Sequence, residues 1–284
     1  MSDAAIRVTG LRKAYRGRPA VDGIDLEVHR GEVFALLGPN GAGKSTTVEI
    51  LEGHRRRDSG AVEVLGGDPT QATAAWKARI GIVLQRVDDL ARSSELTVRE
   101  WVGSMAAYYP DPRPPDQVIE LVGLAGERDA PASSLSGGRR RRLDVALGIV
   151  GRPELLFLDE PTTGFDPEAR RGFWGLIGSL AEQGTTIVLT THYLDEAERL
   201  ADRVAVIAAG RIVEVAPPQT LGGRADAAAT VRWVGPDGPR WLTTDTPTRT
   251  VLELAARFGG EVPELVVERP SLEDVYLRMI GSPA

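Results

Sequence analysis

The stretch GPNGAGKST, residues 38–46, decides how the rest of the chain is interpreted. It satisfies the spacing G-x-x-x-x-G-K-[ST], in which glycines let successive backbone N–H groups turn toward phosphate oxygens. The apolar run EVFALLG (32–38) predicts a buried strand before it, and STTVEILEG (45–53) predicts a helix after it. A loop in that position also points the positive end of the helix at an anion. We therefore predict a phosphate-binding loop, and not a chance glycine-rich turn.

The side chains of this loop have distinct predicted roles. Lys44 reaches the β and γ phosphates of a nucleotide, and the hydroxyl of Ser45 binds Mg²⁺. Thr46 adds a further phosphate contact. The bends in the backbone are supplied by Gly38, Gly41 and Gly43.

Two carboxylates end a second apolar run, LLFLDE (155–160). Ligands of α/β sheets bind at the carboxyl ends of the strands, so these acids are placed for chemistry. Asp159 is suited to hold Mg²⁺, directly or through its water, and Glu160 can polarise an attacking water as general base. The alternative is a strand that ends in solvated acids. The phosphate loop upstream favours the hydrolytic interpretation.

Composition restricts the remaining possibilities. The 284 residues are enough for one large α/β domain with a small appendage. A net charge of -6 argues against general attraction to nucleic acid. The lack of cysteine excludes disulfides, thiolate metal sites and a cysteine nucleophile, and is compatible with a reducing cytosol. The first residues lack the apolar core of a secretion signal, and no apolar run approaches the roughly 18 residues that span a bilayer. We expect a soluble chain whose membrane role, if any, needs a partner.

Short apolar runs alternate with helical patterns along most of the chain, which is typical of a mainly parallel sheet. TTIVLTTH (185–192) predicts another buried strand, and RVAVIAAGRIVEV (203–215) predicts a hairpin that turns at Gly210. Residues 5–15 and 20–32 alternate polar and apolar side chains instead. They predict an antiparallel β flank.

Two regions depart from this pattern. Residues 87–150 predict a helical insertion between strands of the core. After the core, two short strands around a Pro-Asp-Gly turn precede a helix, an extended stretch and a last helix, where Ser271 and Asp274 have the spacing of a capping box. We predict an α/β fold: a P-loop ATPase core with mainly parallel sheet, antiparallel β flank and helical insertion over 1–218, and a small α+β module over 219–284.

The motifs and their order resemble those of the ATP-binding subunits of ABC transporters, over nearly all of residues 6–215. GPNGAGKST is similar to the Walker A motif of that family, and LLFLDEP to its Walker B motif. LSGG (135–138), about twenty residues before Walker B, resembles the signature motif, and TGFDP (163–167) resembles the D-loop. The resemblance therefore rests on several motifs and not on one.

This resemblance assigns roles to three more residues, each of which alone would be taken as structural. Gln85, at the place of the Q-loop glutamine, is implied to contact Mg²⁺ or the water. His192, at the place of the switch histidine, is implied to sense or stabilise the γ-phosphate. Tyr15 matches the aromatic residue that stacks on adenine.

The resemblance also implies that two such chains pair head to tail, with each nucleotide between one chain's phosphate loop and the other chain's signature motif. Ser136 is a good N-cap residue, and Gly137 and Gly138 leave N–H groups uncovered at a helix start. That makes a second anion site; the alternative is an ordinary helix cap. Because the chain has one motif of each kind, we expect an ATP-dependent homodimer.

Four arginines, residues 139–142, follow the signature motif. At about 100° per residue they fan around the helix, so they form no single basic face for nucleic acid. Arg140 is predicted to pair with Asp144 one turn later, and the others to face solvent or neighbouring loops. Arg139 stands where the family most often has glutamine, and Phe165 where its D-loop usually has leucine.

The segment 86–102 occupies the place through which the family contacts its membrane partner. Its apolar residues Leu90, Leu96, Trp101 and Val102 are candidates for a docking surface. The alternative is that they only pack the helical insertion.

The predicted function is that of an ATP-hydrolysing subunit, with ATP and Mg²⁺ as cofactors. It energises export of a small molecule such as a drug or antibiotic through a separate permease, at the cytoplasmic face of the membrane. The carboxyl-terminal stretch PSLEDVYLRMIG (270–281) resembles the drug-exporter branch and favours export over import. The alternative is an ABC-type nucleotide switch in DNA repair or translation, although such relatives usually carry long coiled-coil insertions or two fused ATPase halves.

The predicted site has three parts. Catalytic roles fall to Glu160 and His192, and metal binding to Ser45, Gln85 and Asp159. The predicted ATP-binding residues are Tyr15, Gly38, Pro39, Asn40, Gly41, Ala42, Gly43, Lys44, Ser45, Thr46 and Gln85, with Ser136, Gly137 and Gly138 acting on the nucleotide of the other chain.

Overall fold

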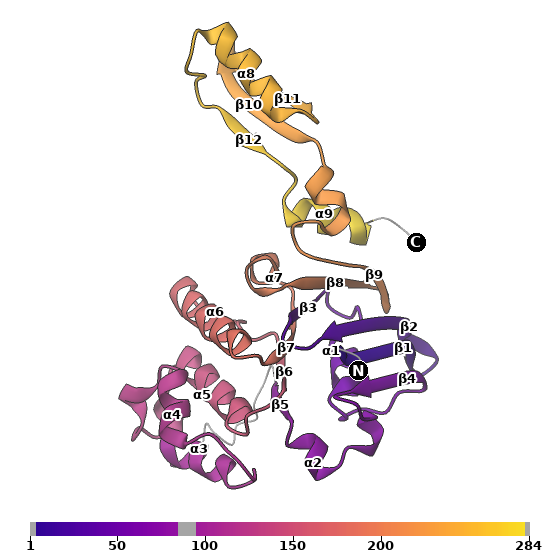
Figure 1. Cartoon of the computed structure of the whole chain (residues 1–284), viewed down its shortest axis with the longest axis vertical. Coiled ribbons are helices and arrows are strands. Elements are labelled where there is room, and N and C mark those ends of the chain that lie inside the picture. Colours follow the sequence, from indigo (N-terminus) through magenta and orange to yellow (C-terminus); the bar gives the residue numbers. More distant parts are fainter. Residues whose placement is uncertain (1–3, 85–94, 282–284) are drawn as a thin grey trace. The chain divides into compact units, whose positions relative to one another are not determined.

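The computed structural model describes residues 4–84 and 95–281 of the chain. The chain divides into two compact units, Met1–Val215 with two sheets and Ala216–Ala284 with one (Figure 1). The sequence places the boundary after residue 218. Within the described ranges, none of the helices combines the length and the apolar character that crossing a membrane requires.

The first unit is built on a six-stranded sheet with the order β5-β6-β7-β3-β8-β9. From β5 to β8 the neighbouring strands run parallel, so their carboxyl ends meet at one edge. Most of their residues are buried, because helices or a second sheet cover both faces, and they therefore form continuous apolar runs in the sequence. The mainly parallel sheet is confirmed. Its strands are β3 (Val33–Leu37), β5 (Ile80–Val83), β6 (Leu155–Asp159), β7 (Thr186–Thr191), β8 (Arg203–Ala208) and β9 (Arg211–Ala216), with Gly210 in the turn between the last two at a φ of 77°.

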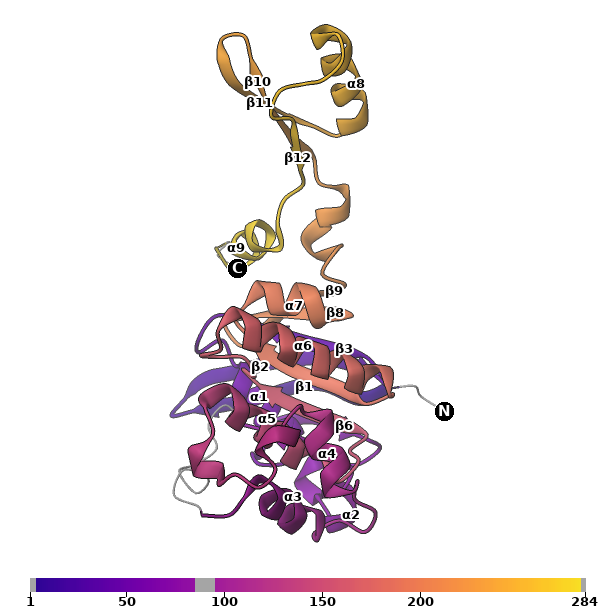
Figure 2. The ribbon, with the colours of Figure 1, turned by 90° about the vertical axis from the view of Figure 1, so that its left-hand side faces the viewer.

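Helices cover the two faces of this sheet differently. α1 lies between the six-stranded sheet and the amino-terminal strands, where its Val48 and Ile50 share one apolar cluster with Phe34 and Phe157 (Figure 1). Figure 2 looks onto the opposite face, along which α6 runs. α6 buries Phe173 and other apolar residues there. The helices of the core are α1 (Lys44–Leu51), α2 (Ala74–Lys77), α6 (Pro167–Glu182) and α7 (Leu194–Leu200).

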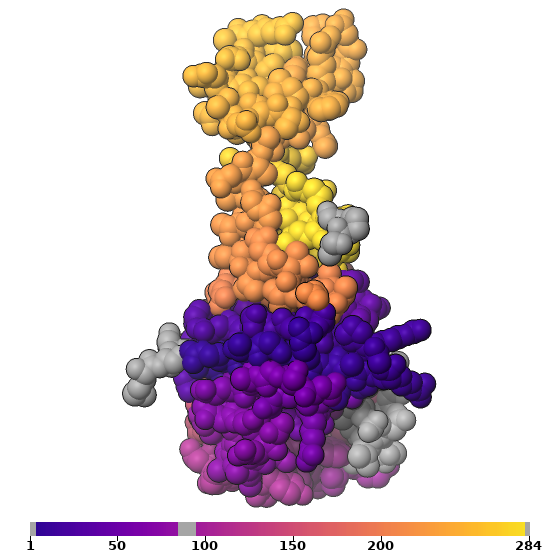
Figure 3. All heavy atoms as spheres, turned by 90° about the vertical axis from the view of Figure 1, so that its right-hand side faces the viewer, coloured from indigo at the N-terminus to yellow at the C-terminus, as the bar shows by residue number. Residues whose placement is uncertain are grey.

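The amino-terminal strands form a separate antiparallel sheet in the order β2-β1-β4. Val8 lies opposite Leu26 on one side and Val62 on the other, and all three are buried in the cluster that α1 joins. The predicted antiparallel flank is confirmed, and its outer surface is the indigo and purple face in Figure 3. Its strands are β1 (Ala4–Tyr15), β2 (Arg18–His29) and β4 (Ser59–Val64).

The predicted helical insertion contains α3 (Val98–Ala106), α4 (Pro115–Leu121) and α5 (Gly137–Ile149). Among the candidate docking residues, Val102 is fully buried. The docking assignment of Val102 is therefore wrong, because its side chain packs inside the insertion. Leu96 is 40% exposed and Trp101 partly buried, whereas Leu90 lies outside the described residues.

The second unit is a small α+β structure. Its antiparallel sheet has the order β11-β10-β12, and α8 packs on it through a cluster that includes Val231, Trp233 and Leu254. The capping box of the last helix is confirmed: Asp274 N donates to the Ser271 hydroxyl at 3.1 Å, and Ser271 N to the Asp274 carboxylate at 2.8 Å. The elements are β10 (Ala229–Gly235), β11 (Gly238–Thr244), α8 (Pro247–Phe258), β12 (Val266–Glu268) and α9 (Leu272–Gly281).

Candidate active site

The glycine-rich loop connects β3 to α1, as the sequence predicts. Gly43 precedes the helix with a φ of 107°, a conformation that side chains rarely adopt, and no side chain caps the helix start. A Cβ at Gly43 would lie 2.4 Å from the carbonyl oxygen of Ala20, and a Cβ at Gly38 would lie 2.4 Å from that of Ile207. The loop is thus held against backbone of β2 and β8, with the N–H groups at the start of α1 uncapped by any side chain.

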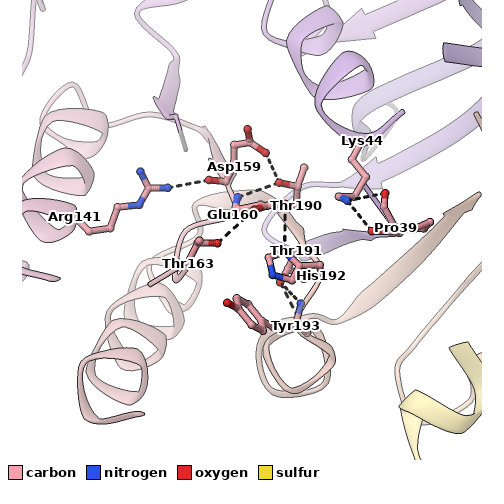
Figure 4. A network of polar contacts seen from close by, with 11 residues as sticks. Pro39, Lys44, Arg141, Asp159, Glu160, Thr163, Thr190, Thr191, His192 and Tyr193 are labelled. Atoms are coloured by element: carbon pink, nitrogen blue, oxygen red, sulfur yellow. Dashed lines mark hydrogen bonds and ion pairs between the residues drawn. The ribbon is translucent and has the colours of Figure 1, made fainter. Parts of the chain in front are cut away.

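Lys44 is buried at the start of α1, where its ammonium group folds back over the loop. Its Nζ donates to the carbonyl oxygens of Gly38 at 2.6 Å and Pro39 at 3.2 Å (Figure 4). Burial lowers the pKa of Lys44, and the carboxylates of Glu160 and Asp159 oppose that shift. The loop therefore holds a positive charge that faces the two acids.

A cavity of about 540 Å³ opens between the loop and the carboxyl ends of the sheet. Its size is in the range of small-molecule sites, and charged and polar groups dominate its chemistry. Gly38, Pro39 and Ala42 belong to the loop but not to this lining, and neither does Asp159. The cavity is lined by Tyr15, Ala20, Asn40, Gly41, Gly43, Lys44, Ser45, Thr46, Glu160 and His192.

The two acids at the end of β6 are both fixed by Thr190 of the neighbouring strand β7. The Thr190 hydroxyl donates to the carboxylate of Asp159, and Glu160 N donates to the carbonyl oxygen of Thr190 at 3.1 Å (Figure 4). Glu160 has a φ of 44°, in the left-handed region that costs a side-chain-bearing residue energy. Thr190 was not among the predicted site residues; its signal is a polar residue near the end of the apolar run TTIVLTTH, on the strand that pairs with β6.

His192 follows β7 and turns toward Glu160. Its Nδ1 lies 3.3 Å from Oε1 of Glu160, and the Thr163 hydroxyl donates to the other carboxylate oxygen at 3.4 Å. Tyr193 N donates to the Thr191 hydroxyl at 2.9 Å, and the Tyr193 ring lies 4.2 Å from the imidazole centroid. The turn after β7 thus places the imidazole beside the Glu160 carboxylate, and both side chains line the cavity.

Tyr15 lines the far end of the same cavity, at the end of β1. Tyr15 is 39% exposed, and two cations lie near its ring: Nζ of Lys13 is 5.6 Å and the Arg55 guanidinium 5.3 Å from the ring centroid. The ring therefore offers a partly exposed aromatic surface to a ligand.

The signature turn is a helix start, as predicted. The Ser136 hydroxyl accepts from Arg139 N at 3.5 Å, and α5 begins at Gly137. Ser136, Gly137 and Gly138 do not line the cavity of their own chain. Gln85 lies outside the described residues, so its predicted contact with Mg²⁺ or the water stays a prediction.

The four arginines at the start of α5 depart from the prediction in two ways. Arg140 does not pair with Asp144, because its guanidinium turns back to the carbonyl oxygens of Leu135 at 3.0 Å and Ser133 at 3.3 Å. The carboxylate of Asp144 instead lies 3.8 Å from Arg141. Arg141, predicted to face solvent or a neighbouring loop, is buried, and its guanidinium donates to backbone carbonyls at the end of β6.

The cavity is large enough for a nucleotide, and in it a glycine-rich loop and a buried lysine face an acid at a strand end. This arrangement defines a P-loop ATPase. Residues 21–163 match the family model described as ABC transporter. The chain belongs to this family, as an ATP-binding subunit with ATPase activity.

Relatives along the whole chain agree with this assignment. The chain is 36% identical to the daunorubicin resistance ATP-binding protein DrrA3 of Streptomyces coeruleorubidus, covering 99% of this chain and 97% of that protein. It is also 36% identical to the Nod factor export ATP-binding protein I of Paraburkholderia xenovorans, covering 99% of this chain and 98% of that protein. Among solved structures, cbiO1 from Clostridium perfringens, part of the ABC transporter complex cbiONQ, superposes with a TM-score of 0.68 at 28% identity, covering 77% of this chain and 90% of that one.

Proposed function

We propose that this chain hydrolyses ATP with Mg²⁺ to energise export of a small molecule through a separate membrane permease. The observation that carries the proposal is the cavity that joins Lys44 and Ser45 of the loop to Glu160 and His192. Export, and not import, is supported by the relatives whose names state drug resistance and Nod factor export. In this proposal the chain lies at the cytoplasmic face of the membrane through its permease.

The donor groups near the loop fit Mg²⁺. The hydroxyl of Ser45 lines the cavity, and the carboxylate of Asp159 is held at the adjacent strand end by Thr190. Such a pair suits Mg²⁺, which commonly takes one or two protein oxygens and completes its shell with phosphate and water. When bound, the ion would neutralise charge on the β and γ phosphates.

The remaining residues divide the reaction between them. Lys44 and the N–H groups at the start of α1 bind the phosphates, and Tyr15 stacks on the adenine. Glu160 accepts a proton from the attacking water. With Nδ1 of His192 directed at Glu160, the same ring holds that carboxylate in place and presents its Nε2 to the γ-phosphate.

We further propose that two copies complete two nucleotide sites, each with the signature turn of the other chain. Since Ser136, Gly137 and Gly138 do not line the cavity of their own chain, their N–H groups suit the phosphate of a second copy. The Glu160→Gln variant with Mg²⁺ and ATP is expected to elute as a dimer in size-exclusion chromatography, because bound ATP bridges the copies and is not consumed. A Ser136→Arg change in that background should restore the monomer peak, since it places a bulky cation at the interface. A monomer in both samples would contradict the dimer.

The permease is proposed to dock in a groove between the core and the helical insertion. A cavity of about 280 Å³ lies there, with the acid Glu52 at its wall and an otherwise largely apolar lining. Glu52 is buried 3.3 Å from Nδ1 of His54, and burial raises its pKa to about 8, with the charges of Asp159 and Glu49 adding to the shift. The groove therefore suits a helix with apolar side chains and a hydrogen-bonding group. Its lining is Glu52, Gly53, His54, Trp76, Lys77, Ile80, Ile82, Met105, Tyr109, Leu147 and Gly148.

Met105→Glu tests this docking site because it places a charge on the apolar wall. A tagged wild-type chain purified from detergent extracts of its native cells is expected to retain a protein with several apolar spans. The Met105→Glu chain is expected to lose that protein, while the ATPase activity of the isolated subunit stays unchanged. Tyr108→Glu is the matched control, since Tyr108 is 84% exposed and does not line the groove. Equal retention of that protein by all three chains would rule out the groove.

A further inference from the structure

Arg141 of α5 is a buried arginine whose side chain leaves the helical insertion and enters the core. Its Nε donates to the carbonyl oxygen of Pro161 at 3.1 Å. One Nη donates to the carbonyl oxygen of Asp159 at 2.9 Å (Figure 4). The other Nη donates to the carbonyl oxygen of Leu84. The carboxylate of Asp144, 3.8 Å away, balances the buried charge. One guanidinium therefore joins three segments of the chain.

Two of these carbonyls lie on either side of Glu160. Asp159 precedes it and Pro161 follows it, so the guanidinium spans the backbone that carries the proposed general base. That backbone has a positive φ of 44° at Glu160, a conformation that persists only when its surroundings enforce it. A guanidinium supplies several donors in a fixed plane, which a lysine ammonium does not. Arg141 is thereby suited to hold the direction of the Glu160 carboxylate.

The same residue is close to the signature turn along α5. Gly137 is the first residue of the helix, and Arg141 follows one turn later, about 6 Å along the axis. Because a helix moves as a rigid element, a displacement of the signature turn is carried to Arg141. Leu84, the third partner, directly precedes the predicted Q-loop residue Gln85.

The other three arginines make their hydrogen bonds and ion pairs within the helical insertion. Arg139 pairs with Glu127 at 3.1 Å, and Arg142 donates to the carbonyl oxygen of Val122 at 2.9 Å. Arg140 bonds to carbonyls of the turn that precedes α5. By contrast, the hydrogen bonds of Arg141 reach the backbone at the end of β6.

We propose that Arg141 is a positioning residue that couples nucleotide contact at the signature turn of a chain to the placement of Glu160 in the same chain. This inference rests on the proposed head-to-tail dimer. There, the signature turn serves the nucleotide of the partner, and Glu160 serves the nucleotide bound by its own loop. ATP at one site then improves the alignment of the base at the other, and the two sites hydrolyse cooperatively.

Arg141→Lys tests the coupling, because it keeps the positive charge beside Asp144 and loses the planar set of donors. We expect kcat to fall about 10²-fold, the cost of a displaced catalytic group, and the Hill coefficient for ATP to fall from above 1 toward 1. Binding of a fluorescent ATP analogue without Mg²⁺ should stay within about twofold, because Arg141 does not line the cavity. Arg142→Met is the matched control from the same helix, with both parameters close to wild type.

The kcat and the Hill coefficient of the Arg141→Lys variant together decide whether the coupling exists. A folded Arg141→Lys variant with wild-type kcat and Hill coefficient overturns the proposal, and so does a fall in kcat without loss of cooperativity. If wild type hydrolyses ATP with a Hill coefficient of 1, the coupling is wrong while the ATPase function stands. If Glu160→Gln shows no ATP-dependent dimer, the proposed dimer fails as well. The Glu160→Gln/Arg141→Lys double variant should still dimerise, which separates coupling from assembly.

Discussion

Glu160→Gln is expected to abolish steady-state ATP hydrolysis while leaving ATP binding intact. The amide keeps the shape of the side chain, so the contacts of Glu160 N with Thr190 are unchanged. It cannot accept a proton from water, however, and loss of a general base typically costs about 10²- to 10⁴-fold in rate. The carboxylate also lies 3.3 Å from His192 Nδ1, so its loss removes a charged partner of the imidazole.

Phosphate release under saturating Mg²⁺ and ATP measures this loss, and binding of a fluorescent ATP analogue measures the retained affinity. Glu182→Gln is a suitable control, because Glu182 is an exposed acid at the end of α6, remote in sequence from Walker B. Hydrolysis at the wild-type rate by Glu160→Gln would remove Glu160 from the mechanism. A parallel loss of nucleotide affinity would indicate a collapsed site and not a missing base.

Lys44→Met is expected to weaken ATP binding and to remove turnover. The ammonium lies within the loop between the carbonyls of Gly38 and Pro39, where it faces two acids. Methionine has similar length but no charge, so the phosphates lose a charge-assisted hydrogen bond and face Glu160 and Asp159 without a cation between them. A hydrogen bond to a charged group contributes about 1.5–3 kcal/mol, which corresponds to roughly a 10- to 150-fold loss of affinity.

Equilibrium binding and ATPase assays at matched protein concentration test this expectation. Lys77→Met is the control, because Lys77 is exposed and does not line the nucleotide cavity. Thermal unfolding of both variants shows whether the loop still folds once the bonds to Gly38 and Pro39 are gone. Wild-type affinity in a folded Lys44→Met protein would contradict the assigned phosphate contact.

Much of the core is predictable from local sequence. The strands that carry the site, β3, β6 and β7, are buried on both faces, so each has a continuous apolar stretch of three or more residues. The loop is predictable because its glycines and lysine occur at a spacing that few other structures require. Parallel strands then bring Lys44, Glu160 and His192 to one edge, although more than a hundred residues separate the first of them from the other two.

Other features depend on long-range contacts that no local pattern encodes. Arg141 sits in a run of like residues, and only the carbonyls of Leu84, Asp159 and Pro161 distinguish it from its neighbours. The carboxylate of Asp144 lies beside Arg141 at an i,i+3 spacing, whereas the predicted i,i+4 spacing favours Arg140. In the same way, the apolar character of Val102 does not tell an interior position from a docking surface.

The close approach of the phosphate loop to its surroundings has a consequence for how selection acts on it. Gly38 and Gly43 lie against the backbones of Ile207 and Ala20, with no room for a methyl group at either position. Replacement of either glycine is therefore harmful before any nucleotide arrives, because the strands themselves would have to separate. These two positions are under selection for foldability as well as for ligand chemistry. A lineage that lost hydrolysis would be expected to keep both glycines after the lysine and the glutamate had drifted.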